Sequence, residues 1–514
     1  NSAPVVVGAP SGIGEDIERW KAFLAMNTVR NAAFNGDGSS VTVKKRDQVV
    51  YIGSNDGMIH AFLASRDNGA TPPPGRTTNY AAVAPCASSA GTNPPQNDQN
   101  YCGGVELWGY APRMLQPYWS SIRGGHYFMV DGTPIVTDVL FTKNTNVPGA
   151  VCASLGSCGA AWEYRTVALE CLGGGGPGCF ALDVTNPFNP QLLWERRFSA
   201  YGGRGTSTSK PQVARVRRTV GGQAIPYYVA LMGGGLNETN AGSRRGTFFA
   251  VGLEDGVIYS SAGSALGASY GRADFAGGPT CLDTNDNGFV DTCYIATTDA
   301  AIYKIRMDND DPARMQMALF YDGRAATGSA TIHSYGRVAA AYDTMKRITL
   351  FFATGNFEDV QNATEQNYIF KVTDATPSAV PVANGGNGTT SCAGATGVYS
   401  MPVGEKVVFD PAFSSGVVYF TSFQPNANPC LPGNGYLYGF TYDACAAGID
   451  SDGNGSADTT KISVGNGLPT APVINETAGK VIVALDDGSV LPQIANTPPQ
   501  IQIPMQKLWW RTIR

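Results

Sequence analysis

Oxygen-bearing side chains recur at alternate positions in the stretch 283–291, a spacing that suits a bound calcium ion. Calcium loops of the EF-hand type take ligands from positions 1, 3, 5, 7 and 9 and carry a glycine at position 6, where the chain turns sharply. Counted from the first aspartate, the ligand positions are Asp283, Asn285, Asn287, the backbone carbonyl of Phe289, and Asp291. Gly288 stands at the turn. All of these ligands are hard oxygen donors, which suit calcium rather than zinc or copper, so the stretch predicts a calcium loop.

A second stretch repeats this spacing nearer the end of the chain. Its ligand positions are Asp450, Asp452, Asn454, Ser456 and Asp458, with Gly455 at position 6. Neither stretch has the position-12 glutamate of a true EF-hand, because Tyr294 and Lys461 stand there. The alternative is a pair of Asp/Asn-rich turns that need no metal, since these residues favour turns by themselves. Two matches favour calcium, and we expect one or two ions with a Kd of roughly 10⁻⁶ to 10⁻³ M, weaker than tight cytosolic sites.

The first loop is predicted to act as an ordering switch. Without metal, Asp283 and Asp291 would face each other across a small loop, and their repulsion would keep it open. Calcium would neutralise them and anchor the hairpin that follows. We expect Asp291→Ala to remove most of the affinity, and Asp291→Lys to imitate the bound state by placing a cation among the ligands. Cys281 and Cys293 lie two residues outside the loop, and a disulfide between them would hold its ends together.

Short β-hairpins recur along the chain. Apolar alternation predicts one at 294–305, directly after the first loop. The same pattern returns at 49–62, 248–259 and 481–491, and in looser form at 127–139, 348–372 and 417–441. Asp-Gly in several of the turns is a strong hairpin feature. Repeated hairpins with variable loops predict an all-β fold, a modified β-propeller of about seven blades; an open β-sandwich is the alternative, but it does not explain the recurrence.

The propeller is predicted to occupy residues 46–514, with long loop insertions near 66–105 and 376–400. Residues 1–45 are predicted to form an otherwise irregular lead-in with one helix at 15–29, where apolar residues have helical spacing. A propeller must close its ring, and we expect the C-terminal strand around Leu508–Ile513 to pair with an early blade.

The bulk composition limits the class of protein. Only 15% of the 514 residues are charged and 63 are glycine, which suits an extracellular β protein with many turns. The net charge of −5 and the lack of a basic stripe argue against nucleic-acid binding. No run of 18 apolar residues exists, so no membrane-spanning helix is expected. The chain begins without a methionine or a signal peptide, and we expect it to be the C-terminal portion of a longer protein.

The eleven cysteines lie mostly in close pairs, which predicts disulfides and an oxidising compartment. The absence of a Cys-x-x-Cys motif and the presence of only three histidines argue against zinc. The pairs predicted from proximity are Cys86–Cys102, Cys152–Cys158, Cys171–Cys179, Cys281–Cys293 and Cys430–Cys445, with Cys392 left over.

Other motifs that resemble functional sites are better explained by structure. Gly267–Gly271 fits the G-x-S-x-G nucleophile elbow, but that motif needs an α/β sheet, which this sequence does not predict. The glycine-rich stretch 173–178 is followed by a strand rather than a helix, so we expect a tight hairpin and no phosphate site. His60, His126 and His333 lie far apart in the sequence. We therefore predict no catalytic residues and no cofactor other than calcium.

Several segments, taken in order, resemble the C-terminal domain of type IV pilus tip adhesins, the PilC/PilY family. The resemblance runs from about residue 45 to the end. It is carried by VYIGSNDGMIHAF (50–62), ELWGYAPRMLQP (106–117), HYFMVDGTPIVTDV (126–139), CFALDVTNPFNPQLLWE (179–195), DTNDNGFVD (283–291), YIATTDAAIYKI (294–305) and VVFDPAFSSGVVYFTSF (407–423).

This resemblance implies a modified β-propeller, exported through the periplasm and displayed at the pilus tip or outer surface of a Gram-negative bacterium. In that family one calcium loop governs pilus extension against retraction and affects surface attachment. Carried over position by position, the ligands are those named above for 283–291, with Asn287 where the family more often has aspartate. The implied partners are pilin or minor pilins at the pilus tip and a host or abiotic surface.

The resulting prediction is a non-enzymatic, calcium-binding adhesin that supports type IV pilus biogenesis and twitching motility. One alternative is a quinoprotein dehydrogenase, because those enzymes are propellers with similar hairpins. They usually carry adjacent cysteines and a repeated tryptophan motif, whereas this chain has no Cys-Cys pair and seven tryptophans. A propeller scaffold for protein assembly is the other alternative.

Overall fold

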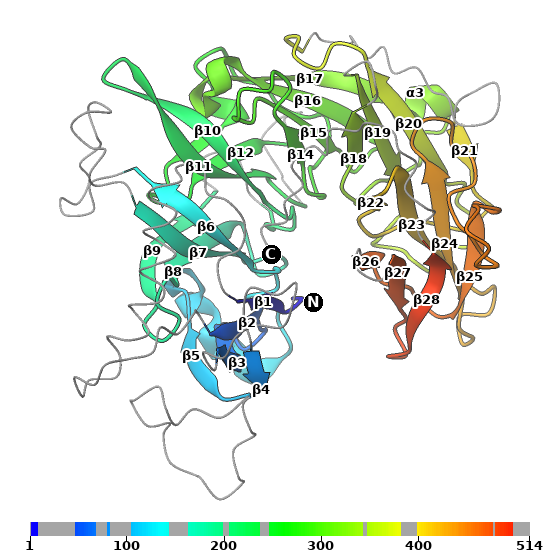
Figure 1. Ribbon diagram of the computed structural model, residues 1–514, viewed down its shortest axis with the longest axis horizontal. Helices are drawn as coiled ribbons and strands as arrows, with labels where there is room; N and C mark the ends of the chain where they lie inside the picture. Colours follow the sequence, from blue (N-terminus) through cyan, green and yellow to red (C-terminus); the bar gives the residue numbers. More distant parts are fainter. Residues whose placement is uncertain are drawn as a thin grey trace, which may run out of the picture. The chain divides into compact units, whose positions relative to one another are not determined.

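The protein is built from seven antiparallel β-sheets, drawn from blue to red in the computed structural model (Figure 1). The structure describes residues 2–8, 47–67, 80–82, 104–142, 163–198, 205–236, 246–342, 347–381, 398–475 and 479–496. Within these residues, each sheet consists of strands that follow one another in the chain. Sheets of this kind are the blades of a β-propeller. The predicted all-β class and the count of about seven blades are confirmed.

The first three sheets contain the strands up to residue 260. They are β1 (Val5–Val7), β2 (Gln48–Gly53), β3 (Ile59–Asp67), β4 (Tyr80–Ala82) and β5 (Glu106–Tyr110); β6 (Ile135–Phe141), β7 (Glu163–Cys171), β8 (Gly178–Asp183) and β9 (Gln191–Arg197); and β10 (Gln212–Val220), β11 (Gln223–Gly233), β12 (Phe248–Gly252) and β13 (Ile258–Ser260). Strand order follows the chain, except that both β4 and β5 pair with β3.

The remaining four sheets contain the strands from residue 280 onward. They are β14 (Thr280–Leu282), β15 (Thr292–Ala296), β16 (Ala301–Met307) and β17 (Met315–Asp322); β18 (Ala339–Tyr342), β19 (Ile348–Ala353), β20 (Tyr368–Asp374) and β21 (Val398–Ser400); β22 (Ala412–Ser414), β23 (Val417–Gln424), β24 (Asn434–Thr441) and β25 (Lys461–Asn466); and β26 (Val473–Asn475), β27 (Lys480–Ala484) and β28 (Val490–Asn496). The described helices are short: η2 (Arg113–Gly124), η4 (Ser261–Gly263), η5 (Asp308–Asp310), η6 (Pro312–Arg314) and α3 (Gly323–Thr327).

The predicted hairpin turns share one local geometry. The aspartate Oδ1 accepts the backbone N–H two residues on, over 3.0 Å at Asp56, 3.0 Å at Asp255 and 2.7 Å at Asp487. The glycine that follows each of them has a φ of 93°, 63° and 85° respectively, a region that glycine enters without steric cost. In the corresponding turn between β15 and β16, Ala300 adopts a φ of 59°. The aspartate therefore closes these turns and the glycine permits them.

Apolar side chains fill the space between neighbouring sheets. The sheet β14–β17 packs against β18–β21 through Tyr294 and Ile302 on one side and Phe352 and Phe370 on the other, all fully buried. The Phe352 and Phe370 rings stack with their centroids 4.5 Å apart. Burying such a side chain stabilises a fold by roughly 1.5–3 kcal/mol. This core fixes the sheet that carries the first predicted calcium loop.

Several expectations differ from the structure or lie outside it. Val5–Val7, placed by the sequence in an irregular lead-in, forms β1 and pairs with β2. The looser repeat at 127–139 contributes only the start of β6 rather than a hairpin. The helix at 15–29 and the closing strand at 508–513 lie outside the described residues. Among the described residues, no helix is long and apolar enough to cross a membrane.

The chain divides into two compact units. The first unit includes residues up to 230 and also 250–258, and the second includes 231–249 and the described residues from 259 onward. Both predicted calcium loops belong to the second unit.

Candidate metal sites

The first loop connects β14 to β15, two antiparallel strands whose ends are joined covalently. Cys281 lies directly opposite Cys293 in the strand register, and the two form a disulfide with their Cα atoms 4.0 Å apart. The predicted Cys281–Cys293 bond is therefore confirmed. Asp291 donates its N–H to the Leu282 carbonyl over 3.0 Å, which closes the loop at its base.

Backbone N–H groups converge on the side chain at position 1 of this loop. Asp283 Oδ1 accepts from Asn285 N at 3.3 Å and Asn287 N at 3.2 Å, and Oδ2 accepts from Gly288 N at 2.6 Å. The amide oxygens continue the pattern, because Asn285 Oδ1 accepts from Asn287 N at 3.1 Å and Asn287 Oδ1 accepts from Phe289 N at 2.9 Å. Gly288 has a φ of 83°. The chain thus coils around the oxygens of positions 1, 3 and 5.

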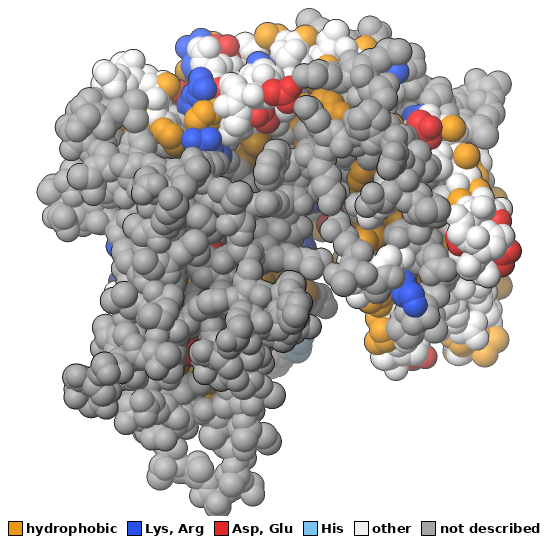
Figure 2. Space-filling view, in the orientation of Figure 1, with side chains coloured by type: hydrophobic (Ala, Val, Ile, Leu, Met, Phe, Trp, Pro, Cys, Tyr) orange, Lys and Arg blue, Asp and Glu red, His pale blue; other side chains and the backbone are white. Residues whose placement is uncertain are grey.

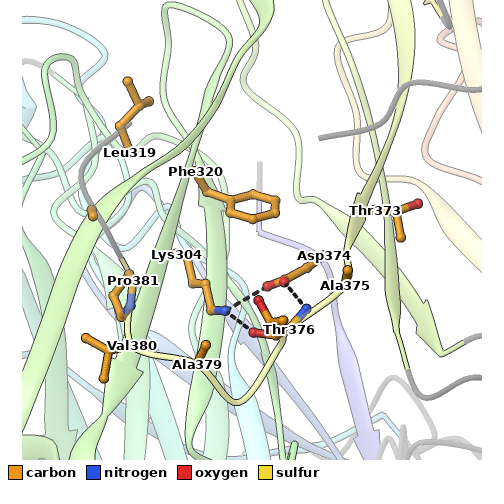
Figure 3. A pocket seen from close by; sticks show the side chains of 11 residues that line it. Lys304, Leu319, Phe320, Thr373, Asp374, Ala375, Thr376, Ala379, Val380 and Pro381 are labelled. Carbon is orange, nitrogen blue, oxygen red and sulfur yellow. Dashed lines mark hydrogen bonds and ion pairs between the residues drawn. The ribbon is translucent and has the colours of Figure 1, made fainter. Parts of the chain in front are cut away.

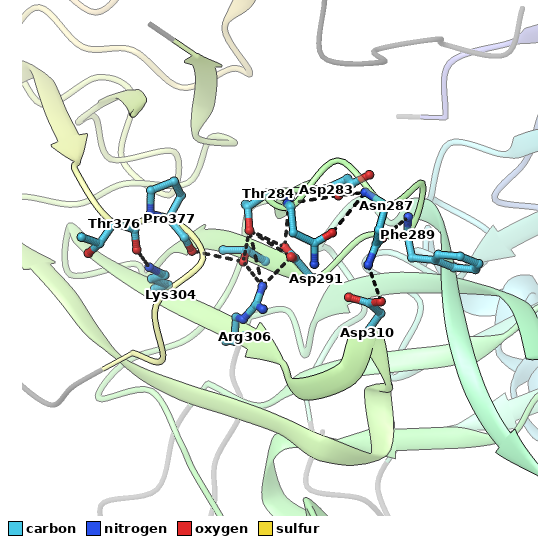
Figure 4. A network of polar contacts seen from close by, with 12 residues as sticks. Asp283, Thr284, Asn287, Phe289, Asp291, Lys304, Arg306, Asp310, Thr376 and Pro377 are labelled. Atoms are coloured by element: carbon cyan, nitrogen blue, oxygen red, sulfur yellow. Dashed lines mark hydrogen bonds and ion pairs between the residues drawn. The ribbon is translucent and has the colours of Figure 1, made fainter. Parts of the chain in front are cut away.

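Asp291, at position 9, is fully buried and has two kinds of partner. Thr284 donates its hydroxyl to Asp291 Oδ1 and Oδ2 over 2.8 and 2.9 Å, and its N–H to Oδ1 over 3.2 Å. Arg306 Nη1, reaching across from β16, lies 2.5 Å from Asp291 Oδ2 (Figure 4). The predicted repulsion between Asp283 and Asp291 is therefore offset, because a guanidinium neutralises one of the two carboxylates.

Two further contacts fix the loop from outside. Asn287 Nδ2 donates to Asp310 Oδ2 over 2.8 Å, which leaves Asn287 Oδ1 directed into the loop. Asp310 also places a carboxylate next to a ligand position where the sequence has a neutral side chain. The Tyr342 hydroxyl donates to the backbone carbonyl of Asp283 over 2.9 Å.

The second loop, between β24 and β25, reproduces the hydrogen bonds of the first. Asp450 Oδ1 accepts from Asn454 N at 3.2 Å, Asp450 Oδ2 from Gly455 N at 2.8 Å, and Asn454 Oδ1 from Ser456 N at 2.8 Å. At position 2, Ser451 takes the place of Thr284 and donates its hydroxyl to Asp458 Oδ2 over 2.9 Å. Position 9 again closes the base, since Asp458 N donates to the Ile449 carbonyl over 2.9 Å.

The second loop has three carboxylates at its ligand positions, whereas the first has two. Asp450, Asp452 and Asp458 each offer an oxygen, and these atoms lie within 4.8 Å of one another. That span equals about twice the usual Ca²⁺–O distance of roughly 2.4 Å. Acidic side chains are visible on the surface beside β24 and β25 (Figure 2). In the described part of the chain, this is the single such cluster of three His, Cys, Asp or Glu side chains.

The environments of the two position-1 carboxylates differ. Burial raises the pKa of Asp283, and the N–H groups of Gly288 and Asn287 only partly compensate. Burial acts in the same direction on Asp450, but the N–H groups of Gly455 and Gly453 outweigh it and hold the pKa of Asp450 below its usual value. A calcium ligand must be deprotonated, and the two shifts make Asp450 the more acidic of the two carboxyls.

A buried ion pair next to the first loop joins its sheet to the following one. Lys304 Nζ, on β16, donates to Asp374 Oδ2 over 2.8 Å and to the Thr376 carbonyl over 2.9 Å beside a cavity of about 140 Å³ (Figure 3). Tyr294 donates its hydroxyl to the same carboxylate oxygen over 2.6 Å. Burial lowers the pKa of Lys304 and raises that of Tyr294. This network ties β15 and β16 to the end of β20.

The glycine-rich motifs and His60, for which the sequence indicates structural roles, have structural surroundings in the described residues. Gly267–Gly271 lies between η4 and β14, with no strand–turn–helix around it. The stretch 173–178 connects β7 to β8, and Cys171–Cys179 closes this hairpin as expected. His60 contacts Asp56 at 2.9 Å and Glu106 at 2.6 Å, on the exposed side of the first sheet.

One predicted disulfide is wrong. Cys430 is a free, exposed thiol, whereas Cys445 is disulfide-bonded. Sequence proximity predicted the wrong pair because strand β24 lies between these two cysteines and separates them in space. The pairs predicted at 86/102 and 152/158, and Cys392, lie outside the described residues.

Some residues that shape the sites could have been found in the sequence, and others could not. A hydroxyl stands at position 2 of both loops, Thr284 and Ser451, and this shared feature was visible. Arg306, Asp310 and Tyr342 approach the first loop from separate elements. Only the strand register and the packing of sheets bring them there.

The chain is similar in sequence to known proteins of type IV pilus biogenesis. No protein-family model matches the chain. The chain is 25% identical to a "Type IV pilus biogenesis factor PilY1 homolog" of Xylella fastidiosa (strain Temecula1), across 100% of this chain and 38% of that protein. It is 26% identical to PilY1 of Pseudomonas aeruginosa (strain UCBPP-PA14), across 52% of this chain and 18% of that protein. The chain therefore spans well under half the length of these relatives.

The fold has a solved counterpart. The crystal structure of the Pseudomonas aeruginosa PilY1 C-terminal domain matches with a TM-score of 0.56 and 17% sequence identity, covering 96% of this chain and 100% of that one. That domain is a β-propeller, in agreement with the seven sheets described above.

Proposed function

We propose that this chain, a homologue of the PilY1 C-terminal domain, is the calcium-binding propeller of a type IV pilus biogenesis factor and has no enzymatic role. The relatives are named for pilus biogenesis. The metal proposal rests on one observation: the same nine-residue loop, with the same hydrogen bonds around oxygens at alternate positions, occurs twice in sheets of different sequence.

The donor sets fit calcium. The first loop offers the oxygens of Asp283, Asn285, Asn287, Phe289 and Asp291, and the second those of Asp450, Asp452, Asn454, Ser456 and Asp458. Carboxylates, amide oxygens and backbone carbonyls are the ligands that this hard cation takes in flexible geometry. The N–H groups that converge on each position-1 carboxylate hold the loop in its coiled form. A bound ion would supply the positive charge that the clustered oxygens lack.

Calcium in the first loop would act on the propeller through the elements that contact it. Cys293 and Thr292 at the end of the loop belong to β15, and Thr292 donates its hydroxyl over 3.4 Å to the carbonyl of Pro377, in the segment that follows β20. Ordering the loop would therefore act on the contact between this sheet and the segment that follows β20. We propose that this ordered surface contacts pilin or minor pilins, supports pilus extension against retraction, and assists attachment to a host or abiotic surface from an extracellular position at the pilus tip.

Calorimetry of the metal-free protein tests calcium binding. Wild type is expected to bind two ions, Asp291→Ala and Asp458→Ala one each, and the double variant none. Asp286→Asn is the matched control, because it removes a carboxylate from the same first loop at position 4, outside the ligand set, where the φ of 58° suits asparagine. Equal binding by wild type and the double variant would refute the calcium proposal.

The cellular role needs a separate test. Asp291→Ala, Asp458→Ala and Asp286→Asn are introduced into the complete protein in its own host, and pilus number, twitching and surface attachment are scored. Loss of piliation with the first variant and normal piliation with the control would support a regulatory calcium site. Unchanged pili despite lost calcium binding would reduce the site to a structural one. A visible quinone absorption band in the purified protein would favour the dehydrogenase alternative instead.

A further inference from the structure

The two loops share their backbone hydrogen bonds but differ in the partners of the carboxylate at position 9. At position 9 of the first loop, Asp291 carries a guanidinium 2.5 Å from Oδ2. At position 9 of the second loop, Asp458 has no basic partner among the described residues. Lys461, which stands at position 12 there, is turned away and pairs with Glu405 over 2.7 Å. A cation on a neighbouring strand thus pairs with position 9 of the first loop, whereas no described residue provides one at position 9 of the second.

Arg306 is held firmly where it meets the first loop. It lies on β16 directly opposite Thr292 in the strand register, and its side chain is only 15% exposed. Its Nη1 also lies 3.4 Å from the Thr284 hydroxyl and 3.3 Å from the Thr292 hydroxyl. Figure 4 shows it pointing from the sheet toward Asp291. Because Asp291 is fully buried, the pair is poorly screened by solvent.

The second loop indicates that this guanidinium is not needed to position the carboxylate. Within the described part of the chain, Ser451 alone holds the Asp458 carboxylate, with its N–H over 3.2 Å and its hydroxyl over 2.9 Å. Thr284 makes the same two kinds of contact to Asp291. What Arg306 adds to the first loop is therefore charge. A positive charge fixed on a ligand repels an arriving dication and occupies one of the lone pairs that the ion would use.

We propose that Arg306 is a tethered cation that competes with calcium for Asp291 and sets the first loop to a lower calcium affinity than the second. The proposal rests on the proposed calcium function and assigns this residue the role of tuning it. Arg306 neutralises Asp291 through their ion pair. Calcium enters only when its concentration is high enough to overcome that pairing. The first loop then responds to changes in calcium at levels where the second is already filled.

The test uses a background in which only the first loop can bind. In Asp458→Ala protein, calcium affinity is measured by calorimetry for Arg306, Arg306→Gln and Arg306→Lys. The glutamine keeps a hydrogen-bond donor without the charge, and the lysine keeps the charge. Arg306→Gln is expected to bind calcium at least about tenfold more tightly, since it removes a unit charge next to the ion. Arg306→Lys is expected to stay within about threefold of the arginine form, because the charge is unchanged.

Thermal unfolding without and with calcium provides the second readout. Arg306→Gln should melt at a lower temperature than the arginine form in the absence of calcium, because Asp291 loses its counter-ion, and should gain more from added calcium. A merely structural arginine would lower both melting temperatures alike and leave the affinity unchanged or weakened. That outcome overturns the proposal and leaves the calcium function standing. No binding by any of the three proteins would instead refute the calcium function of the first loop, and the proposal with it.

Discussion

The Tyr342 hydroxyl donates a hydrogen bond of 2.9 Å to the backbone carbonyl of Asp283, which joins the first loop to β18, an edge strand of the neighbouring sheet. Burial raises the pKa of Tyr342, and the carboxylates of Asp291 and Asp283 raise it further. The hydroxyl therefore stays protonated and remains a donor at neutral pH. The contact also brings a phenol ring to the edge of the proposed metal site.

The ring provides a spectroscopic test of where a metal binds. Terbium takes oxygen ligands as calcium does, and a tyrosine at this distance should sensitise its emission. In the Asp458→Ala background we expect strong tyrosine-excited terbium emission that added calcium displaces. Tyr342→Leu should reduce this emission severalfold, while calorimetry still detects calcium. Undiminished emission from the leucine variant would place the bound ion elsewhere.

The structure changes the outcome expected for Asp291→Lys. The sequence suggested that a lysine would imitate bound calcium, but position 291 is fully buried and Arg306 already lies beside it. Two buried cations in contact should lower the free energy of unfolding by at least about 3 kcal/mol, the usual minimum when a buried pair is broken. Denaturant unfolding measures the loss. The control is Asp458→Lys, an exposed position in the twin loop, which should cost under about 1 kcal/mol.

Restoring the pair with reversed charges separates charge from shape. Asp291→Lys combined with Arg306→Asp should recover part of the lost stability, since opposite charges face each other again. No recovery in the double variant would show that packing rather than charge accounts for the cost.

The Cys281–Cys293 bond is expected to matter for metal binding as well as for stability. Replacing both cysteines with alanine should cost roughly 2–4 kcal/mol of unfolding free energy and weaken calcium binding at the first loop, because its ends are no longer held together. Cys171–Cys179 provides a matched control, since these residues also lie directly opposite each other in a hairpin, in another sheet. Removing that bond should lower stability and leave calcium affinity unchanged. Equal calcium affinity in both variants would contradict the link.

Much of the local structure could be predicted because it depends on neighbouring residues. Asp255 and Gly256 close a turn through one hydrogen bond and one positive φ. The Asp-Gly dipeptide that makes this turn can be recognised in the sequence. The loop at 283–291 is equally local, since its ligand oxygens are held by N–H groups within the same nine residues. Repeats of such units gave the number of sheets.

The parts that could not be predicted depend on contacts between distant segments. Nothing at Arg306 distinguishes it from other strand arginines until β16 pairs with β15 and places it opposite Thr292. Val5–Val7 has too few residues to indicate a strand, and only its pairing with β2 makes it one. Cys430 and Cys445 are close in sequence, but strand β24 separates them.

The corrected cysteine assignment leads to a simple labelling experiment. Cys430 is free and exposed, and such a thiol reacts with alkylating reagents. Mass spectrometry of the native, unreduced protein after labelling should find the label on Cys430 and none on Cys445. The label on the peptide that contains position 430 should disappear in Cys430→Ser. Absence of the label from both Cys430 and Cys445 in the unreduced protein would restore the pairing expected from the sequence, whereas a label on Cys445 would contradict its disulfide.

A buried carboxyl in the second sheet predicts a pH dependence of stability. Glu170, on β7, is fully buried, and neither of its side-chain oxygens has a hydrogen-bond partner among the residues that the structure describes. Burial raises the pKa of Glu170 well above its usual value, and the nearby Asp131 raises it further. The folded protein therefore holds this proton at pH values where the unfolded chain has released it. The free energy of unfolding must fall as the pH rises above the unfolded pKa of about 4.3.

Glu170→Gln removes the titrating proton while preserving the shape of the side chain. At pH 5 the variant and wild type should unfold at similar denaturant concentrations, because wild-type Glu170 is then largely protonated in the folded state. At pH 8 the variant should be more stable by at least about 1 kcal/mol, since burying an ionised carboxylate costs more than burying an amide. Asp308→Asn, which changes a carboxylate whose side chain is 44% exposed, is the control and should leave the pH profile unchanged. A glutamine variant that loses stability in parallel with wild type between pH 5 and pH 8 would show that other groups control the profile.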